Sequence, residues 1–315
     1  MAFKREPQVF PASINTLRVG VGDNAMVLGG ENVLPFYTFD APVENRPKIG
    51  VAITDSGFHR GCPGIEAFYE GAESVVDAAR KASAMPGADF LVIVLEGAHP
   101  DHGDRPPEDC AALVRAVADA VDVPIAVEGS KSIEKDAKIF ALVAEAVSDK
   151  NILVLSAREE DYKTVAAAVG LACGQNVGAE SAVDINLAKQ LNVLISQMGV
   201  NTEKMAMNLG SAAAGYGFEY VASTIDRVKG AALSQNDAML QMPIISPIES
   251  ETWAVKESVA SEGDYPEWGN AEARAVNMEV ATAAASLAAG SNAVILRHPD
   301  AVKTVSELID ALIWG

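Results

Sequence analysis

The segment Leu95–Cys110 reads LEGAHPDHGDRPPEDC and gathers two histidines, three aspartates and a cysteine. Imidazole, carboxylate and thiolate are the usual protein ligands of zinc and iron, so these residues form a candidate metal site. Cys110, however, opens an apolar stripe of helical spacing that runs to Val121, and this spacing predicts a buried core cysteine. His99 and His102 then remain as the candidate ligands of the segment.

From Lys48 onward, short apolar segments alternate with longer segments of helical period. This alternation is typical of parallel strands joined by crossover helices, and eight such units close into a TIM barrel. A doubly wound open sheet is the competing fold. The expected strands are Lys48–Ile53, Phe90–Glu96, Pro124–Gly129, Asn151–Ser156, Asn176–Ser181, Lys204–Leu209, Met242–Pro247 and Ala293–His298. The sequence therefore predicts an α/β protein with a single (βα)8 TIM barrel over residues 48–315.

The residues before the barrel carry two shorter apolar runs, Arg18–Gly20 and Ala25–Leu28, around the turn residues GDN. Such a pattern predicts a β-hairpin. We expect residues 1–47 to form an N-terminal arm and a hairpin that closes the bottom of the barrel.

Loop lengths distinguish the two ends of the predicted barrel. Most connections from helix to strand are short, whereas three connections from strand to helix are long: residues 54–74, 97–107 and 248–270. Loops this long in a compact domain are usually functional, and barrel sites lie at the carboxyl ends of the strands. We expect the working face at that end.

Four histidines belong to this face, with several aspartates beside them. They are His59, His99, His102 and His298, with Asp55, Asp101, Asp104 and Asp300 nearby. The four imidazoles could converge on a metal. The strand ends, however, offer Thr54, Ser156, Glu180 and Asn208 in place of a ligand set, and the two histidines of the 97–107 loop are not fixed on a helix. We therefore predict no metal site.

Carboxylates stand at or near the ends of three predicted strands, at Glu96, Glu128 and Glu180. Burial beside like charges would shift their pKa values toward neutrality and suit them for acid or base chemistry. The alternative is that they accept hydrogen bonds from backbone amides, and the sequence leaves both open.

Two further segments of this face have shapes suited to binding. The run Asn208–Tyr220 (NLGSAAAGYGFEY) consists largely of small residues, which let a flat ligand approach the backbone closely. The loop over residues 248–270 carries Trp253, Tyr265 and Trp268, and we expect these rings to cover an apolar ligand or to anchor a partner protein.

Composition excludes several classes of partner. The chain has 43 acidic and 24 basic residues and a net charge of −19, which repels nucleic acid and anionic membranes. A membrane span and a signal peptide are not expected, and we predict a cytoplasmic protein. The three cysteines are too few for a typical iron–sulfur cluster. Cys62 is expected to be a passive thiol and Cys173, like Cys110, a core residue.

Three long segments resemble a known family: VPIAVEGSKSIEKDAKIFALVAEAV, GSAAAGYGFEYVASTIDRVKGAAL and LQMPIISPIESETWAVKES. They are similar to the small, or delta, subunit of the corrinoid iron–sulfur protein that works with CO dehydrogenase/acetyl-CoA synthase. The resemblance extends from about Gly29 to the C-terminus, and the length of the chain resembles the bacterial form more than the longer archaeal one.

The resemblance implies a barrel paired with a large subunit that carries the [4Fe-4S] cluster and most of the corrinoid domain. The pair would take a methyl group from methyltetrahydrofolate through a methyltransferase, deliver it to acetyl-CoA synthase in the reductive acetyl-CoA (Wood–Ljungdahl) pathway, and depend on a reductive activator. This chain would cap the corrinoid without independent catalytic activity. The expected cap residues, chosen by their position on the barrel, are Asp55, His99, Glu128, Ser130, Asn208, Tyr216, Trp253 and His298.

Two alternatives remain. A pterin-binding methyltransferase uses the same fold, and Asp55 and Asn208 could hold its pterin. A metal hydrolase would need stoichiometric metal in the purified chain.

Overall fold

The computed structural model describes residues 6–314, so that positions 1–5 of the expected N-terminal arm and the final residue 315 lie outside the described residues. Eight parallel strands form one sheet in the order β8-β7-β6-β5-β4-β3-β10-β9. The strands are β3 (Lys48–Thr54), β4 (Phe90–Val94), β5 (Ile125–Glu128), β6 (Leu153–Ala157), β7 (Asn176–Glu180), β8 (Met205–Asn208), β9 (Ile245–Pro247) and β10 (Ala293–Leu296).

The two outer strands of this order approach each other and nearly close the sheet. An isolated parallel bridge joins Met207 to Ile244, and the amide of Met207 donates to the carbonyl of Pro243 at 2.8 Å. The predicted TIM barrel is thus confirmed, and the open sheet is excluded. Each predicted strand overlaps an observed one, with boundaries that differ by at most three residues.

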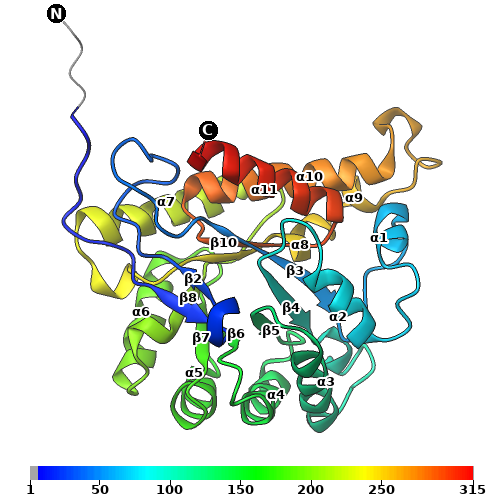
Figure 1. Cartoon of the computed structure of the whole chain (residues 1–315), viewed down its shortest axis with the longest axis horizontal. Helices are drawn as coiled ribbons and strands as arrows, with labels where there is room; N and C mark the ends of the chain where they lie inside the picture. Colours follow the sequence, from blue (N-terminus) through cyan, green and yellow to red (C-terminus); the bar gives the residue numbers. More distant parts are fainter. Residues whose placement is uncertain (1–5, 315) are drawn as a thin grey trace, which may run out of the picture.

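Helices surround the strands, with α7, α10 and α11 along one side and α2 to α6 along the other (Figure 1). The helices are α1 (Pro63–Phe68), α2 (Val75–Ser83), α3 (Pro107–Ala120), α4 (Ile133–Ala146), α5 (Tyr162–Val165), α6 (Ile185–Gln197), α7 (Phe218–Ser234), α8 (Ile248–Thr252), α9 (Lys256–Val259), α10 (Ala271–Ala289) and α11 (Pro299–Trp314), with a π-helical segment, η3, over Ala166–Ala172 and short 3-10 turns.

Side chains alternate along the strands, and this alternation separates two apolar layers. Outward-facing residues such as Val51, Leu91 and Val127 pack against the helices, whereas Ala52, Phe90 and other inward-facing residues fill the barrel. Gly50 leaves room for the ring of Phe90, because a Cβ atom at Gly50 would lie 2.5 Å from that ring.

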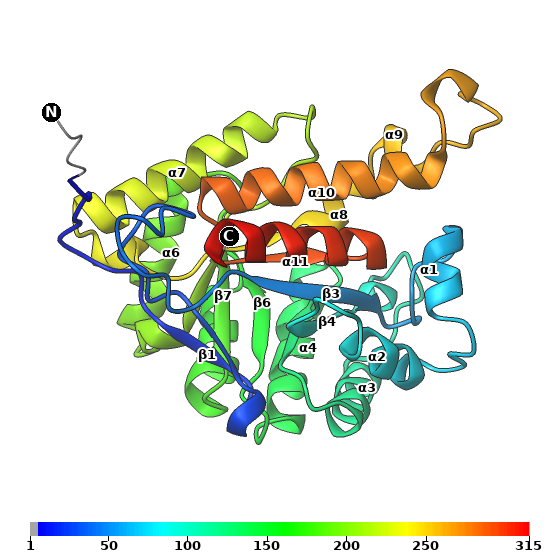
Figure 2. The same cartoon turned by 45° about the horizontal axis from the view of Figure 1, so that its top comes forward.

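The hairpin of β1 (Leu17–Val19) and β2 (Met26–Leu28) covers the amino ends of the strands (Figure 2). Its apolar side chains belong to the same cluster as the barrel interior. Asn151 and Asn176, which precede or begin β6 and β7, donate from Nδ2 to the carbonyl of Arg18 at 2.9 and 3.1 Å. The hairpin therefore covers the barrel interior at the amino ends of the strands.

The cysteines differ in burial. Cys110 is fully buried in the core, as predicted, and Cys62 is buried as well. Cys173 only packs against the edge of the core and keeps partial exposure, which corrects the prediction for this residue. The reason is its place at the end of η3, where the neighbours Leu171 and Gly174 are exposed.

Candidate functional site

A cavity of about 310 Å³ opens at the carboxyl ends of the strands. We call it the mouth cavity, and its lining comes from most of the barrel: Val94, Glu96, His102, Glu128, Gly129, Ser130, Lys131, Leu155, Ser156, Arg158, Glu180, Asn208, Gly210, Ser211, Pro247, Glu249, Ser250, Glu251 and Arg297. Its volume is in the range of small-molecule sites. The working face expected from loop lengths therefore does carry a cavity.

Strand alternation places the polar groups of this cavity. Ala126 and Ala206 point into the barrel, so Glu128 and Asn208, two residues further along β5 and β8, face the same interior. Pairing of β7 with β8 sets Glu180 directly beside Asn208. The carboxyl groups of Glu128 and Glu180 and the amide of Asn208 thus lie together at the carboxyl ends of the strands, next to the apolar side chains that fill the barrel.

Burial governs the electrostatics of these carboxyl groups. Burial, with the nearby charges of Glu249 and Glu180, raises the pKa of Glu128 well above its ordinary value. Burial also raises the pKa of Glu249, although Arg297 opposes this shift. Oε1 of Glu180 lies 3.2 Å from Nε of Arg158 in an ion pair. In the part of the chain that the structure describes, Glu128 Oε1 and Glu249 Oε2 are buried without a hydrogen-bond partner.

A further buried carboxyl group lies behind Arg297. Glu279 of α10 accepts the backbone amides of Arg297 and His298 at 2.6 and 3.1 Å. Burial raises the pKa of Glu279 to about 7. The guanidinium of Arg297 lies 5.7 Å from the ring centroid of Trp253. Glu279 therefore holds the end of β10 and directs Arg297 toward the mouth cavity.

The two polar residues predicted beside Glu128 are held by hydrogen bonds. The amide and hydroxyl of Ser130 both donate to Oδ1 of Asp136, at 2.7 and 2.6 Å. Asn208 donates from Nδ2 to the hydroxyl of Ser156 at 3.2 Å and accepts the amide of Gly210 at 3.0 Å. Both side chains thus shape the cavity while their own hydrogen-bonding groups are largely engaged.

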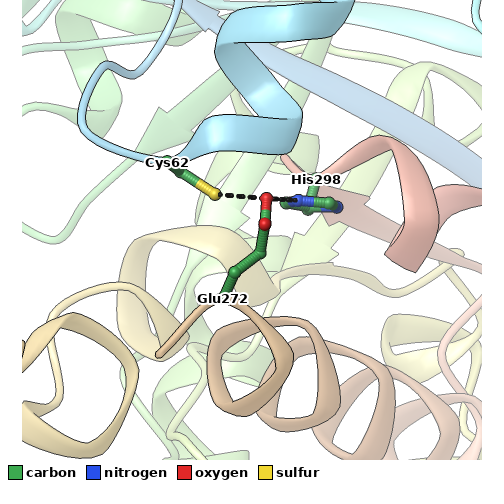
Figure 3. A group of neighbouring side chains, drawn as sticks. All are labelled: Cys62, Glu272 and His298. Atoms are coloured by element: carbon green, nitrogen blue, oxygen red, sulfur yellow. Dashed lines mark hydrogen bonds and ion pairs between the residues drawn. The ribbon is translucent and has the colours of Figure 1, made fainter. Parts of the chain in front are cut away.

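A second cluster, Cys62, Glu272 and His298, lies beside the barrel end (Figure 3). Oε1 of Glu272 lies 3.1 Å from Sγ of Cys62 and 3.0 Å from Nε2 of His298, and it also accepts the amide of Gly64 at 2.5 Å. Within residues 6–314 this is the one group of three metal-ligand side chains whose ligand atoms all lie within 4.8 Å of one another.

The positions of the protons in this cluster determine whether it can bind a metal. Nδ1 of His298 accepts the amide of Asp300 at 3.1 Å, so Nε2 carries the proton and donates to Glu272. To bind a metal through Nε2, the ring of His298 would have to carry its proton on Nδ1 instead. That proton would then point at the amide N–H of Asp300. Burial and the Glu272 carboxylate raise the pKa of Cys62 to about 11. The cluster is therefore a set of satisfied hydrogen bonds, with the neutral, passive thiol that the sequence predicts.

The histidines do not converge as the metal hypothesis requires. His99 and His102 form one pair, with ring centroids 5.1 Å apart. His59 and His298 lie near the ring of Trp253 instead, at centroid distances of 5.4 and 6.3 Å.

Three of the eight predicted cap residues, Glu128, Ser130 and Asn208, line the mouth cavity. Asp55 lines a different cavity, and its buried carboxylate accepts the amide of Gly97 and pairs with Nε of Arg105 at 2.9 and 3.0 Å. The two residues of the pterin hypothesis, Asp55 and Asn208, are therefore not brought together.

The other predicted cap residues differ in exposure. Tyr216 is exposed and donates to Glu257, and His99 is half-buried in its loop. His298 is fully buried in the Glu272 cluster. Trp253 corrects the expectation of an exposed covering ring: it is only 8% exposed, because it ends α8 and packs between His59 and His298.

Residues 16–303 match the family described as CO dehydrogenase/acetyl-CoA synthase delta subunit. The chain belongs to this family. Acetyl-CoA decarbonylase/synthase complex subunit delta 2 of Methanosarcina acetivorans is 31% identical over 314 residues, which cover 98% of this chain and 71% of that protein. The subunit delta of Methanopyrus kandleri is 32% identical over 299 residues, covering 94% and 72%.

Solved structures support the fold of this delta-subunit family member. Dihydropteroate synthase of Xanthomonas albilineans aligns with a TM-score of 0.59 over 95% of this chain and 99% of that one, at 13% identity. The Yersinia pestis enzyme aligns with a TM-score of 0.54 over 84% and 93%, at 12% identity. Identities this low show the shared barrel alone.

Sequence reasoning missed Arg297, Glu249, Glu272 and Glu279. Arg297 follows the last strand and Glu249 begins the helix after β9, so strand-end position would have found both. Glu272 and Glu279 lie on α10 among alanines, and only the folded structure shows that they contact the end of β10.

Proposed function

We propose that this delta subunit is the small subunit of a corrinoid iron–sulfur methyl carrier and that its barrel mouth caps a corrinoid held mainly by a large subunit. Family membership over residues 16–303 supports this proposal. The hairpin covers the opposite end of the barrel, so the mouth is the end that can face a cofactor. The shorter, bacterial form and a cytoplasmic location stay predictions.

The residues of the mouth fit a corrinoid cap. Corrinoids carry amide groups at their periphery, and Ser211 Oγ is a buried hydroxyl at the mouth that has no partner among residues 6–314. Tyr216, half of whose surface is exposed, adds an aromatic group in the loop between β8 and α7. We propose His99 and Tyr216 as rim contacts above Glu128, Ser130 and Asn208, while Asp55, Trp253 and His298 hold the surrounding loops.

The bound corrinoid supplies the cobalt that carries the methyl group from methyltetrahydrofolate, through a methyltransferase, toward acetyl-CoA synthase. The role of this chain is to exclude water and oxidants from that cobalt. The [4Fe-4S] cluster is assigned to the large subunit, because such a cluster takes four thiolates and Cys62, Cys110 and Cys173 lie in separate elements. A reductive activator completes the proposed set of partners.

Neither a nucleic acid nor a membrane is among the proposed partners. The net charge of −19 repels both polyanions and anionic bilayers. None of the helices in residues 6–314 combines the length and the apolar character of a membrane span.

Purification of the native complex tests the proposal. We expect the chain to co-purify with a cysteine-rich subunit and with cobalt and iron, measured by elemental analysis. Tyr216→Ala should weaken the pair at least tenfold, whereas Tyr37→Ala, an exposed tyrosine of the N-terminal arm, should not. A chain that stays monomeric and never carries cobalt in its native extract would refute the proposal.

A further inference from the structure

The acidic side chains of the mouth cavity outnumber its permanently charged bases. Among the described residues that line it, five are carboxylic acids and three are permanently charged bases, and His102 is a further, titratable base. The acids are Glu96, Glu128, Glu180, Glu249 and Glu251, and the bases are Lys131, Arg158 and Arg297. Only one close ion pair forms between the two sets, Arg158 with Glu180. Burial beside the other acids raises the pKa of Glu128, and burial raises that of Glu249, so a guest that brings positive charge would stabilise the ionised form of these two carboxyl groups.

Two of these acids have unpaired oxygen atoms, which indicates that the guest carries hydrogen-bond donors. Glu249 is 1% exposed, and its Oε2 finds no partner in the described part of the chain. The same holds for Oε1 of Glu128, which comes from a different strand-end element. Buried polar atoms are nearly always paired, and an unpaired one destabilises the protein. A ligand with two N–H donors would satisfy both atoms.

The apolar residues that line the mouth cavity favour a planar donor group on the guest. Val94, Leu155 and Pro247 line the cavity beside the two carboxyl groups, so apolar surface accompanies the acceptors. A planar, delocalised cation is more weakly hydrated than an ammonium group and presents N–H donors in a fixed plane. It therefore loses less on entering a partly apolar cavity and can bridge two carboxyl groups.

We propose that the mouth cavity is a binding site for a small molecule with an amidinium or guanidinium group, bridged by Glu128 and Glu249. This site goes beyond the corrinoid cap and does not rest on it, because the cavity lies within this chain alone.

Binding of a cation at this site should release protons, and this release can be measured. Burial beside Glu249 and Glu180 raises the pKa of Glu128, and an entering cation favours its ionised form, so binding at a pH where Glu128 still holds its proton releases that proton to solvent. Affinity should then rise with pH and level off once Glu128 is ionised in the free protein. The charged or titratable groups that line the same cavity are Glu96, His102, Lys131, Arg158, Glu180, Glu249, Glu251 and Arg297.

Benzamidine is the cationic probe of the site, and benzamide, which has the same shape but no charge, is its control. Isothermal titration calorimetry on the full chain, in two buffers of different ionisation enthalpy, measures both affinity and released protons. We expect saturable benzamidine binding, at least tenfold tighter than benzamide, with proton release. Nα-acetylargininamide is a second probe, because a guanidinium on a protein side chain would reach the same carboxyl groups. Tighter binding of benzamidine than of this probe would support a free small molecule, and the reverse would overturn that assignment.

Variants locate the site. Glu128→Gln and Glu249→Gln should each weaken benzamidine binding at least tenfold, and Glu128→Gln should release fewer protons on binding than the parent, because Glu249 alone then keeps a raised pKa. Glu203→Gln, an exposed residue before β8 at the far end of the barrel, makes the same charge change and should leave affinity unaltered. Unchanged melting temperatures would show that the variants fold. Absence of saturable binding up to about 10 mM, equal affinity for benzamide, or wild-type affinity in both variants would each overturn the proposal.

Discussion

Oε1 of Glu272 lies 3.0 Å from Nε2 of His298, and this contact joins the start of α10 to the end of the last strand. Hydrogen bonds from His298, Cys62 and Gly64 hold the pKa of Glu272 below its ordinary value. One carboxylate oxygen of α10 thus joins this helix to two other segments, residues 62–64 and the end of the last strand (Figure 3).

Glu272→Ala should therefore destabilise the protein by about 1–3 kcal/mol, because the buried Nε2–H of His298 would lose its acceptor. Urea unfolding measures the change. Glu267→Ala, at an exposed position of the preceding loop, is the matched control and should stay within about 0.5 kcal/mol of the parent. Equal stability of the two variants would show that the cluster contributes nothing.

Gly50→Ala should destabilise the barrel by about 1–3 kcal/mol, because the new methyl group would lie 2.5 Å from the Phe90 ring in a filled interior. Gly263→Ala is the control, since its Cβ atom would meet nothing closer than 3.7 Å in an exposed loop. Thermal unfolding of both variants compares them. A Gly50→Ala melting temperature equal to that of the parent would contradict the tight packing seen here.

The raised pKa of Glu279 predicts a stability that falls as pH rises. Its ordinary pKa is 4.5, and burial raises it to about 7 in the folded protein. Between these values the folded protein keeps a proton that the unfolded chain has lost, so the free energy of unfolding declines by up to about 3 kcal/mol and then levels off above pH 7. Glu128 and Glu249, whose pKa values are also raised, act in the same direction.

Chemical unfolding at several pH values between 5 and 8 tests this. Glu279→Gln cannot titrate and should show a shallower decline than the parent. Parallel pH profiles for the two proteins would rule out Glu279 as the source.

The three thiols should differ in reactivity toward iodoacetamide at pH 8. Cys173 is the only one with partial exposure, whereas Cys62 and Cys110 are buried and their pKa values are raised to about 11. Mass spectrometry should show slow labelling of Cys173 in the folded protein. Cys62 and Cys110 should be labelled only in denaturant. Labelling of Cys62 at the rate of Cys173 would contradict its burial against Glu272.

The barrel could be predicted from sequence because strand and helix periods are local properties. Each inward or outward position follows from alternation, and Glu128 and Asn208 could therefore be placed at the mouth. The contacts of Glu272 and Glu279 could not be predicted, since they depend on how α10 lies against β10. Trp253 was misplaced for the opposite reason: its long loop suggested exposure, but a short helix, α8, turns the ring inward.

The hairpin covers the amino ends of the strands, and the mouth cavity opens at their carboxyl ends. A small molecule in the mouth cavity would therefore enter and leave through the end that a partner subunit would cover. The order of events is then constrained, because a guest has to arrive before the partner docks or wait until it leaves. Docking would slow the exchange of the guest, and by reciprocity a guest that alters the mouth would change the affinity for the partner.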